Sequence, residues 1–551
     1  MARNFAFAQR PLPGGGLPRL TVNERLQAAS SSPVAGFALG GLVIAIGLAI
    51  SIVISGRNLS YGVGAGALLM VGGWCLLSSR YEVTLGVVLM YLALLDGYLK
   101  LKFGSNLVTA GRDILVWLIS LGALMRWSVH RQKLMLPPLT GFLIAWTIVV
   151  VIQLANPLNA GTVHAIQSLR PHLEFVPLFF FGFLIMRTRA RMRGFLLLIV
   201  IAAAINGIVN LYQSGLSTLQ FAAWGPGYHA RIFGGAGFGI GISPRTYVNA
   251  LGITQVRPFG LGSDIGFGGT MCVIGLPASL ALIGLRREPV FRLLGALMGI
   301  CVVIGVYTSQ TRTAVLAALV GALAYVSLTV VAHQRARSVV RLIGVVILIA
   351  ITLQVVTNAS SQGSFSRYDS ITPNRALDTA YNYRIGTITD TARYFRQYPF
   401  GAGIGSVGPA GALSANGADS ALDGESEFTT LVLETGIPGF VVMITFLIVL
   451  MRVTFQRVRR IEDADIRLLL AGIAAPLVAM VAAGYTGPTT LATPYSPYLW
   501  FVAGILSWWL IAAPKRAQTA VLESRIADLW SKATESQASD AASPSTGRAA
   551  E

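Results

Sequence analysis

The chain has 551 residues, of which 54% are hydrophobic and only 12% are charged. Soluble globular proteins carry about 25% charged residues, and disordered chains are poor in hydrophobic ones. The composition therefore excludes an ordinary soluble enzyme and a disordered protein. It predicts an all-α polytopic integral membrane protein.

The net charge of +19 arises from 42 Lys and Arg residues against 23 Asp and Glu residues. A nucleic-acid-binding protein would gather these cations on a soluble basic face. Here most of them lie in short runs between apolar stretches, as the positive-inside rule predicts. This distribution indicates a multi-pass protein with both termini in the cytoplasm, and nucleic acid is excluded as a partner.

Apolar stretches of about 20 residues, long enough to cross the hydrocarbon layer, recur along the chain from residue 34 to residue 513. We expect about 12–14 transmembrane helices by this length rule. The candidate spans are 34–55, 61–79, 82–99, 107–126, 136–155, 173–187, 194–213, 265–285, 292–308, 313–332, 341–356, 428–451, 467–486 and 496–513. The third and fourth are the weakest because Asp96, Arg112 and Asp113 lie inside them.

Both ends of the chain are expected to lie outside the transmembrane domain of residues 34–513. Residues 1–33 are polar and contain a Gly- and Pro-rich stretch, which predicts a flexible cytoplasmic N-terminus without a cleavable signal. Residues 514–551 are expected to form a cytoplasmic, partly disordered tail.

Two connections, 214–264 and 357–427, are much longer than the rest, and both are assigned to the extracytoplasmic side. Loops longer than about 12–15 residues are usually either functional or disordered. Neither sequence resembles a low-complexity linker, so we interpret both as parts of a binding site. Candidate ligand-binding residues in them are Trp224, Tyr228, Arg375 and Arg393.

Arginines on the predicted outer side run against the positive-inside trend. They are Arg231, Arg245, Arg257, Arg312, Arg367, Arg375, Arg384, Arg393 and Arg396. A planar, permanently charged guanidinium suits the oxygens of a diphosphate. Arg312, in a very short turn between two apolar stretches, and Arg257, beside a glycine-rich helix start, are the strongest candidates. The alternative is that individual arginines reach lipid headgroups or pair with acids such as Asp390.

Acidic residues gather where the span at 428–451 begins. Glu425 or Glu427 could accept a proton from a sugar hydroxyl, or could instead stabilise the free N–H groups of the helix start. Glu434, deeper in the span, is expected to be a structural hydrogen-bonding group. The histidines and cysteines lack metal-ligand spacing, so no metal site is expected.

Three segments, 257–277, 309–321 and 381–439, together resemble the bacterial O-antigen ligase and Wzy-type polysaccharide polymerase family. The third is the most specific, because Arg, Pro, Gly-x-Gly and Glu-x-Gly-x-x-Gly follow one another in the family's order. The resemblance covers about residues 194–450. The N-terminal spans match the family only in hydropathy.

The resemblance implies a metal-independent, inverting glycosyltransferase without a cofactor, acting at the outer face of the bacterial cytoplasmic membrane. Its donor would be a glycan linked to a polyprenyl diphosphate such as undecaprenyl diphosphate. Arg257 and Arg312 would hold the diphosphate, and Arg384 would line the same cavity. Trp224, Tyr228, Arg375 and Arg393 would be glycan-binding residues. Besides membrane lipid, the expected partners are a chain-length regulator and a flippase of the same pathway.

One departure from the family bears on the reaction. Its ligases carry histidine followed by asparagine where this chain has Glu425 and Ser426. The difference favours a polymerase of exopolysaccharide or O-antigen repeat units, with Glu425 and Arg312 as catalytic residues. The alternatives are a ligase that transfers glycan to a lipid or protein, and a transporter of lipid-linked glycan, although no internal repeat typical of transporters is evident.

Overall fold

The structure, a computed structural model, describes residues 71–78, 81–104, 107–129, 136–159, 162–237, 240–242, 246–248, 252, 254–285, 288–329, 385–407 and 426–514. The chain divides into two compact units, Met1–Thr84 with Leu118–His130 and Leu85–Trp117 with Arg131–Glu551. The predictions for the N-terminus, for the span at 341–356 and for the tail beyond residue 514 fall outside the described residues.

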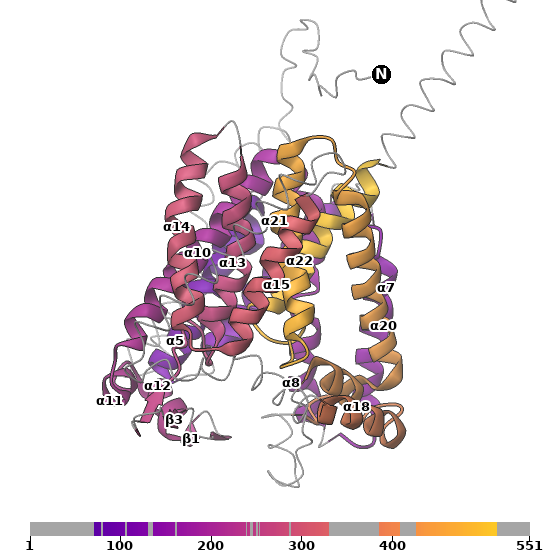
Figure 1. The fold of residues 1–551 in the computed structure, drawn as a ribbon. Helices are drawn as coiled ribbons and strands as arrows, with labels where there is room; N and C mark the ends of the chain where they lie inside the picture. Colours follow the sequence, from indigo (N-terminus) through magenta and orange to yellow (C-terminus); the bar gives the residue numbers. More distant parts are fainter. Residues whose placement is uncertain are drawn as a thin grey trace, which may run out of the picture. The chain divides into compact units, whose positions relative to one another are not determined.

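Long apolar helices make up most of the described chain (Figure 1). Nine helical segments within it are long and apolar enough to cross a membrane. They are Tyr81–Phe103 (α4 Tyr81–Met90, the π-helix Tyr91–Leu95 and α5 Asp96–Phe103), Ser168–Ile185 (from α8 Thr162–Leu173 and α9 Pro177–Ile185), α10 Arg189–Ser214, α13 Phe267–Gly284, α14 Pro289–Thr308, α15 Arg312–Thr329, α20 Glu427–Val458, α21 Ala464–Ala483, and Tyr495–Ala512 (α22 Tyr495–Leu506 and the π-helix Ser507–Ala512). This architecture confirms the predicted all-α polytopic membrane fold.

Small residues let the central helices of the second unit approach closely. A Cβ atom added to Gly305 on α14 would lie 2.3 Å from Cα of Gly207 on α10. An added Cβ on Gly275 of α13 would meet Cβ of Ala203 at the same distance of 2.3 Å. Close backbone contact of this kind is the usual basis of helix association inside membranes.

The first unit is described only in part. Residues 71–77 are helical, and the part of α6 (Leu107–Val129) from Leu118 onward belongs to this unit. An added Cβ on Gly122 of α6 would lie 2.3 Å from the carbonyl oxygen of Leu76, so these two segments also pack through a glycine.

The long connection predicted at 214–264 is structured. It holds α11 (Thr218–Ala222), α12 (Pro226–Phe233) and two antiparallel β-hairpins, β1–β2 (Gly235–Gly237 with Ile240–Ile242) and β3–β4 (Thr246–Val248 with Thr254–Val256). These elements gather at one end of the second unit, which we call the hairpin end (Figure 1). Phe221, Tyr228 and Phe259 form a small aromatic core beneath them.

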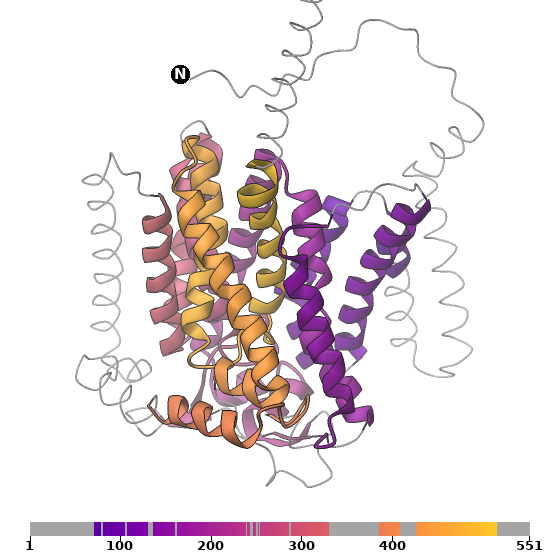
Figure 2. The same ribbon diagram turned by 90° about the vertical axis from the view of Figure 1, so that its right-hand side faces the viewer.

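The second long connection supplies α18 (Ile385–Gln397), which lies across the hairpin end near the start of α20 (Figures 1 and 2). Tyr394 and Phe395 of α18 pack against Leu433 and Phe440 of α20. Gly436 interrupts α20 with φ of 67°. An added Cβ there would lie 2.5 Å from the Phe400 carbonyl carbon, so only glycine fits this contact.

Candidate functional site

A cleft of about 640 Å³ lies where several helices of the second unit begin or end. Its walls come from the segment before α13, the turn before α15 and the loop between α21 and α22. The lining residues are Ser263, Asp264, Ile265, Gly266, Phe267, Thr270, Thr311, Thr313, Ala314, Ala483, Thr486, Gly487, Pro488, Thr489, Leu491, Ala492, Thr493 and Tyr495.

The helix starts around the cleft favour an anionic ligand. Phe267 is the first residue of α13, Tyr495 the first of α22, and Thr313 the second of α15, and all three line the cleft. The helix dipole adds partial positive charge at each of these starts, and this charge, more than open N–H groups, favours an anion, because the Phe267 and Gly268 N–H groups already donate to the Asp264 and Phe259 carbonyls. The carboxylate of Asp264 also lines the cleft, but Arg231 of α12 lies 3.5 Å from it and offsets its charge.

Arg312 is the first residue of α15, and its two neighbours in the chain line the cleft. The preceding turn is tightly built: the Ser309 hydroxyl donates to the Val306 carbonyl at 2.7 Å, and the Thr311 hydroxyl donates to the Ser309 carbonyl at 3.0 Å. The predicted diphosphate residue therefore begins a helix at the edge of the cleft, on a fixed turn.

Arg257 directly follows strand β4, and buried amides of α10 hold the residues after it. The Gln213 side-chain oxygen accepts hydrogen bonds from the Phe259 and Gly260 N–H groups, each at 2.9 Å. The Asn206 side-chain oxygen accepts one from the Leu261 N–H, also at 2.9 Å. This segment continues into the cleft wall at Ser263, so α10 sets the position of the chain between Arg257 and the cleft.

Sequence reasoning missed these amides, although a signal was present. Asn206, Asn210 and Gln213 recur at intervals of four and three residues inside an apolar span, which places them on one face of a helix. Buried amides in a membrane helix need partners. Such a polar stripe therefore indicates an irregular backbone segment packed alongside.

Glu427 has a role that neither sequence interpretation anticipated. Its side chain is 3% exposed. Its carboxylate accepts hydrogen bonds from the Thr490 N–H at 2.9 Å, from the Thr490 hydroxyl and from the Thr489 N–H. Ser426, with its capping box, satisfies the start of α20 instead. Glu427 thus holds the α21–α22 loop that lines the cleft, whereas Glu425 lies outside the described residues.

Glu434 connects the glycine-rich loop at residues 401–405 to α8. Its carboxylate accepts a hydrogen bond from the Gly405 N–H at 3.1 Å, and His172 Nε2 lies 2.9 Å from its other oxygen. Gln153 adds a hydrogen bond of 2.7 Å to the Phe400 carbonyl just before the loop. These contacts agree with the prediction that Glu434 is a structural hydrogen-bonding group.

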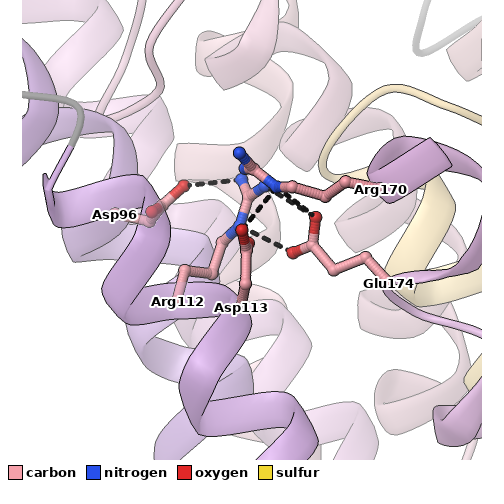
Figure 3. Close-up of polar contacts among 5 residues, drawn as sticks. All are labelled: Asp96, Arg112, Asp113, Arg170 and Glu174. Carbon is pink, nitrogen blue, oxygen red and sulfur yellow. Dashed lines mark hydrogen bonds and ion pairs between the residues drawn. The ribbon is translucent and has the colours of Figure 1, made fainter. Parts of the chain in front are cut away.

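A second charged cluster surrounds Arg112 (Figure 3). Arg112 lies 3.1 Å from Asp96 and 2.8 Å from Glu174, and Arg170 lies 2.5 Å from Asp113. Two guanidiniums and three carboxylates thus pair with one another away from the cleft lining, which indicates a structural role. Asp96, Arg112 and Asp113, which made the predicted spans at 82–99 and 107–126 the weakest, are each paired with a residue of another helix.

The remaining candidates separate into buried, exposed and undescribed residues. Tyr228 is fully buried between Phe221 and Phe259, so its ring has no exposed face in this structure, and its contact with a glycan stays a prediction. Trp224 packs partly against the same core. Arg375 and Arg384 lie outside the described residues.

Arg393, another predicted glycan-binding residue, lies on α18 with its side chain 55% exposed. Its guanidinium donates to the Tyr394 hydroxyl at 3.3 Å and lies 3.3 Å from the Asp390 carboxylate. The hydrogen bond and the nearby negative charge raise the pKa of Arg393 above its ordinary value. In the structure Arg393 thus pairs with an acid, as the alternative interpretation of the outer arginines describes.

A family model described as O-antigen ligase matches residues 296–444 of the chain. The match covers about a quarter of the chain, and over this segment the chain is similar to the O-antigen ligase family. It contains Arg312, Glu427 and Glu434, and it thereby confirms the resemblance drawn from the sequence motifs. Arg257 and the aromatic hairpin region precede the matched segment. No curated protein matches the chain.

Proposed function

We propose that this protein, whose residues 296–444 match the O-antigen ligase family, is a membrane glycosyltransferase that polymerises polyprenyl-diphosphate-linked repeat units into exopolysaccharide or O-antigen. The family supports glycan transfer from a lipid carrier. The polymerase reaction, the undecaprenyl diphosphate carrier, and the roles of a flippase and a chain-length regulator are parts of the proposal.

One observation carries the proposal furthest: the polar cleft adjoins an apolar cavity. That narrow cavity lies between the Tyr91–Leu95 π-helix, α10, α13 and α22, and Thr493 lines both spaces. The apolar lining includes Leu92, Phe195, Ile199, Met271, Ile274, Pro497 and Phe501. The apolar cavity has a volume of only about 50 Å³, so beside the polar cleft it could contact no more than the part of a hydrocarbon chain nearest a charged headgroup.

The distribution of cations supports an extracytoplasmic location for the cleft. Arginines cluster at the helix ends remote from the hairpin end, near the start of α10 and between α20 and α21. They are Arg187, Arg189, Arg191, Arg193, Arg452, Arg457, Arg459, Arg460 and Arg467. By the positive-inside rule, we place these helix ends at the cytoplasmic face of the inner membrane and the hairpin end at its outer face.

In the proposed reaction, an acceptor hydroxyl attacks the anomeric carbon of the donor from the side opposite the diphosphate. The new glycosidic bond forms as the bond to the diphosphate breaks, with inversion at that carbon. Arg312, Arg257 and the helix starts would stabilise the negative charge on the leaving diphosphate. Because Glu427 is buried and already accepts several hydrogen bonds, we assign the hydroxyl proton to Glu425, which directly precedes Ser426.

A ligase is the second candidate, and the family description favours it. The two reactions share a donor and differ only in the acceptor, which is a second lipid-linked glycan for the polymerase. Glutamate at position 425, where family ligases carry histidine, favours the polymerase.

The proposal is tested with purified protein in liposomes supplied with the host's polyprenyl-diphosphate repeat unit, without metal or nucleotide. Gel analysis should reveal a ladder of longer lipid-linked chains. Transfer only to an added lipid or protein acceptor would identify a ligase. Movement of the substrate across the bilayer without any new glycosidic bond would overturn the enzyme in favour of a transporter.

A further inference from the structure

One hydroxyl joins the two chain segments that carry the proposed diphosphate arginines. Tyr247 Oη on β3 lies 2.9 Å from Gln255 Oε1 on β4, and it also contacts Gln310 Oε1 in the turn before α15. Gln255 lies two residues before Arg257, and Gln310 lies two residues before Arg312. A single tyrosine thus bridges equivalent points on both segments.

The β3–β4 hairpin dictates this placement. Tyr247 pairs directly with Gln255 in the antiparallel register, so their side chains project from the same face of the hairpin. A phenol has one proton to donate and can also accept, whereas a glutamine amide can present either its oxygen or its NH₂ group. The hydroxyl therefore donates its single proton to the oxygen of one amide, and it accepts from the other once that amide is turned to present its NH₂ group; a phenylalanine ring can do neither.

The far end of the bridge is a constrained position. Gln310 adopts φ of 52°, the left-handed region that side chains other than glycine seldom occupy. Its side chain is 2% exposed, so the amide is cut off from water and depends on a protein partner. Tyr247 supplies that partner, and the contact holds the turn in the conformation from which Arg312 begins α15.

We propose that Tyr247 is a positioning residue that sets the spacing between Arg257 and Arg312. The inference rests on the proposed function, in which both guanidiniums hold one diphosphate. On the Arg257 side the chain is already fixed by Gln213 of α10. The bridge through Tyr247 extends that fixed point to the Arg312 turn. Without the hydroxyl, both charges remain, but their separation is no longer fixed, and binding that needs both at once weakens.

The test compares two lipids that differ in the number of phosphates. Binding of undecaprenyl diphosphate and undecaprenyl monophosphate is measured on the full chain in nanodiscs, for the wild type and for Tyr247→Phe. We expect the diphosphate Kd to rise roughly fivefold to tenfold in the variant, the effect of about one hydrogen bond. Monophosphate binding should stay within about twofold, because a single phosphate does not report the spacing of two arginines. A merely structural defect would weaken both lipids alike and would overturn the proposal.

Tyr212→Phe is the matched control, because Tyr212 is 62% exposed on α10. Gln310→Ala removes the same contact from the other side, and we expect the same selective rise in the diphosphate Kd. This variant replaces Tyr247→Phe in the test if Tyr247→Phe fails to reach the membrane. The double variant Tyr247→Phe/Gln310→Ala should bind the diphosphate no more weakly than the single variant with the higher Kd, since each single variant already removes the contact between the two side chains. Independent, additive losses would contradict the bridge.

Arg312→Lys, measured in parallel, separates the two proposals. If Arg312→Lys binds the diphosphate normally, the arginine clamp fails and the role of Tyr247 fails with it. If Arg312→Lys loses binding while Tyr247→Phe matches the wild type, only the positioning role is overturned.

Discussion

The carboxylate of Glu427 accepts a hydrogen bond from the backbone N–H of Thr490 at 2.9 Å, across 63 residues of sequence. The contact ties the start of α20 to the loop between α21 and α22. That loop forms one wall of the cleft, and Gly484 at its beginning accepts a further hydrogen bond from the Glu427 N–H at 2.8 Å. The shape of the cleft therefore depends on a carboxylate that does not itself line it.

Glu427→Gln should destabilise the protein by about 1–3 kcal/mol, because a buried NH₂ group would replace an acceptor that faces several donors. Thermal unfolding of the purified protein in detergent measures the effect. Glu462→Gln is the control, since Glu462 is exposed in the loop between α20 and α21. Equal unfolding temperatures for wild type and Glu427→Gln would contradict the buried-acceptor role.

Arg312→Lys should lower the rate of glycan transfer about 10²–10³-fold, because an ammonium group cannot bind a diphosphate through two parallel hydrogen bonds. The liposome assay measures this rate at matched protein levels. Arg460→Lys, an exposed arginine at the opposite helix ends, should remain active. Full activity of Arg312→Lys in a normally expressed protein would rule out the clamp.

Glu425→Gln should lower turnover about 10²–10⁴-fold while leaving undecaprenyl diphosphate binding unchanged, since it removes a general base but no diphosphate contact. Turnover and lipid binding are measured on the same preparation. Unchanged turnover would restrict Glu425 to a charge at the start of α20.

Arg112→Met should destabilise the fold by about 3–5 kcal/mol, because it leaves the Asp96 and Glu174 carboxylates buried without their cation. Denaturant unfolding of the purified protein measures the loss. Arg452→Met, at an exposed position of α20, is the comparison. If both variants unfold alike, the cluster does not stabilise the bundle.

Hydropathy predicted the nine candidate spans of the described residues, because a membrane helix must satisfy its own backbone and expose apolar side chains. The predicted spans 107–126 and 136–155 correspond to α6 and to the shorter apolar helix Thr140–Ala155, which are not among the nine. The predicted 265–285 and 292–308 are α13, Phe267–Gly284, and α14, Pro289–Thr308. Arg312 was also identifiable, since a charged residue in a very short turn between apolar stretches is conspicuous.

The supporting contacts could not be predicted in the same way. Arg112 pairs with Glu174 across 62 residues, and Glu427 pairs with Thr490 across 63. Such pairs depend on which helix ends meet in the fold, and a single sequence does not encode that as a local pattern. Tyr247 has no recognisable local signal either, because its role depends on the register of a short hairpin.

The most direct test of the cleft as the substrate site is photo-crosslinking with an undecaprenyl diphosphate analogue that carries its photoreactive group beside the diphosphate. Crosslinked peptides are mapped by mass spectrometry on the full chain in nanodiscs, with unlabelled undecaprenyl diphosphate as competitor. Competed crosslinks should fall in the cleft lining, at 263–270, 311–314 and 483–495. Competed crosslinks confined to the Arg112 cluster or to the exposed face of α18 would contradict this location.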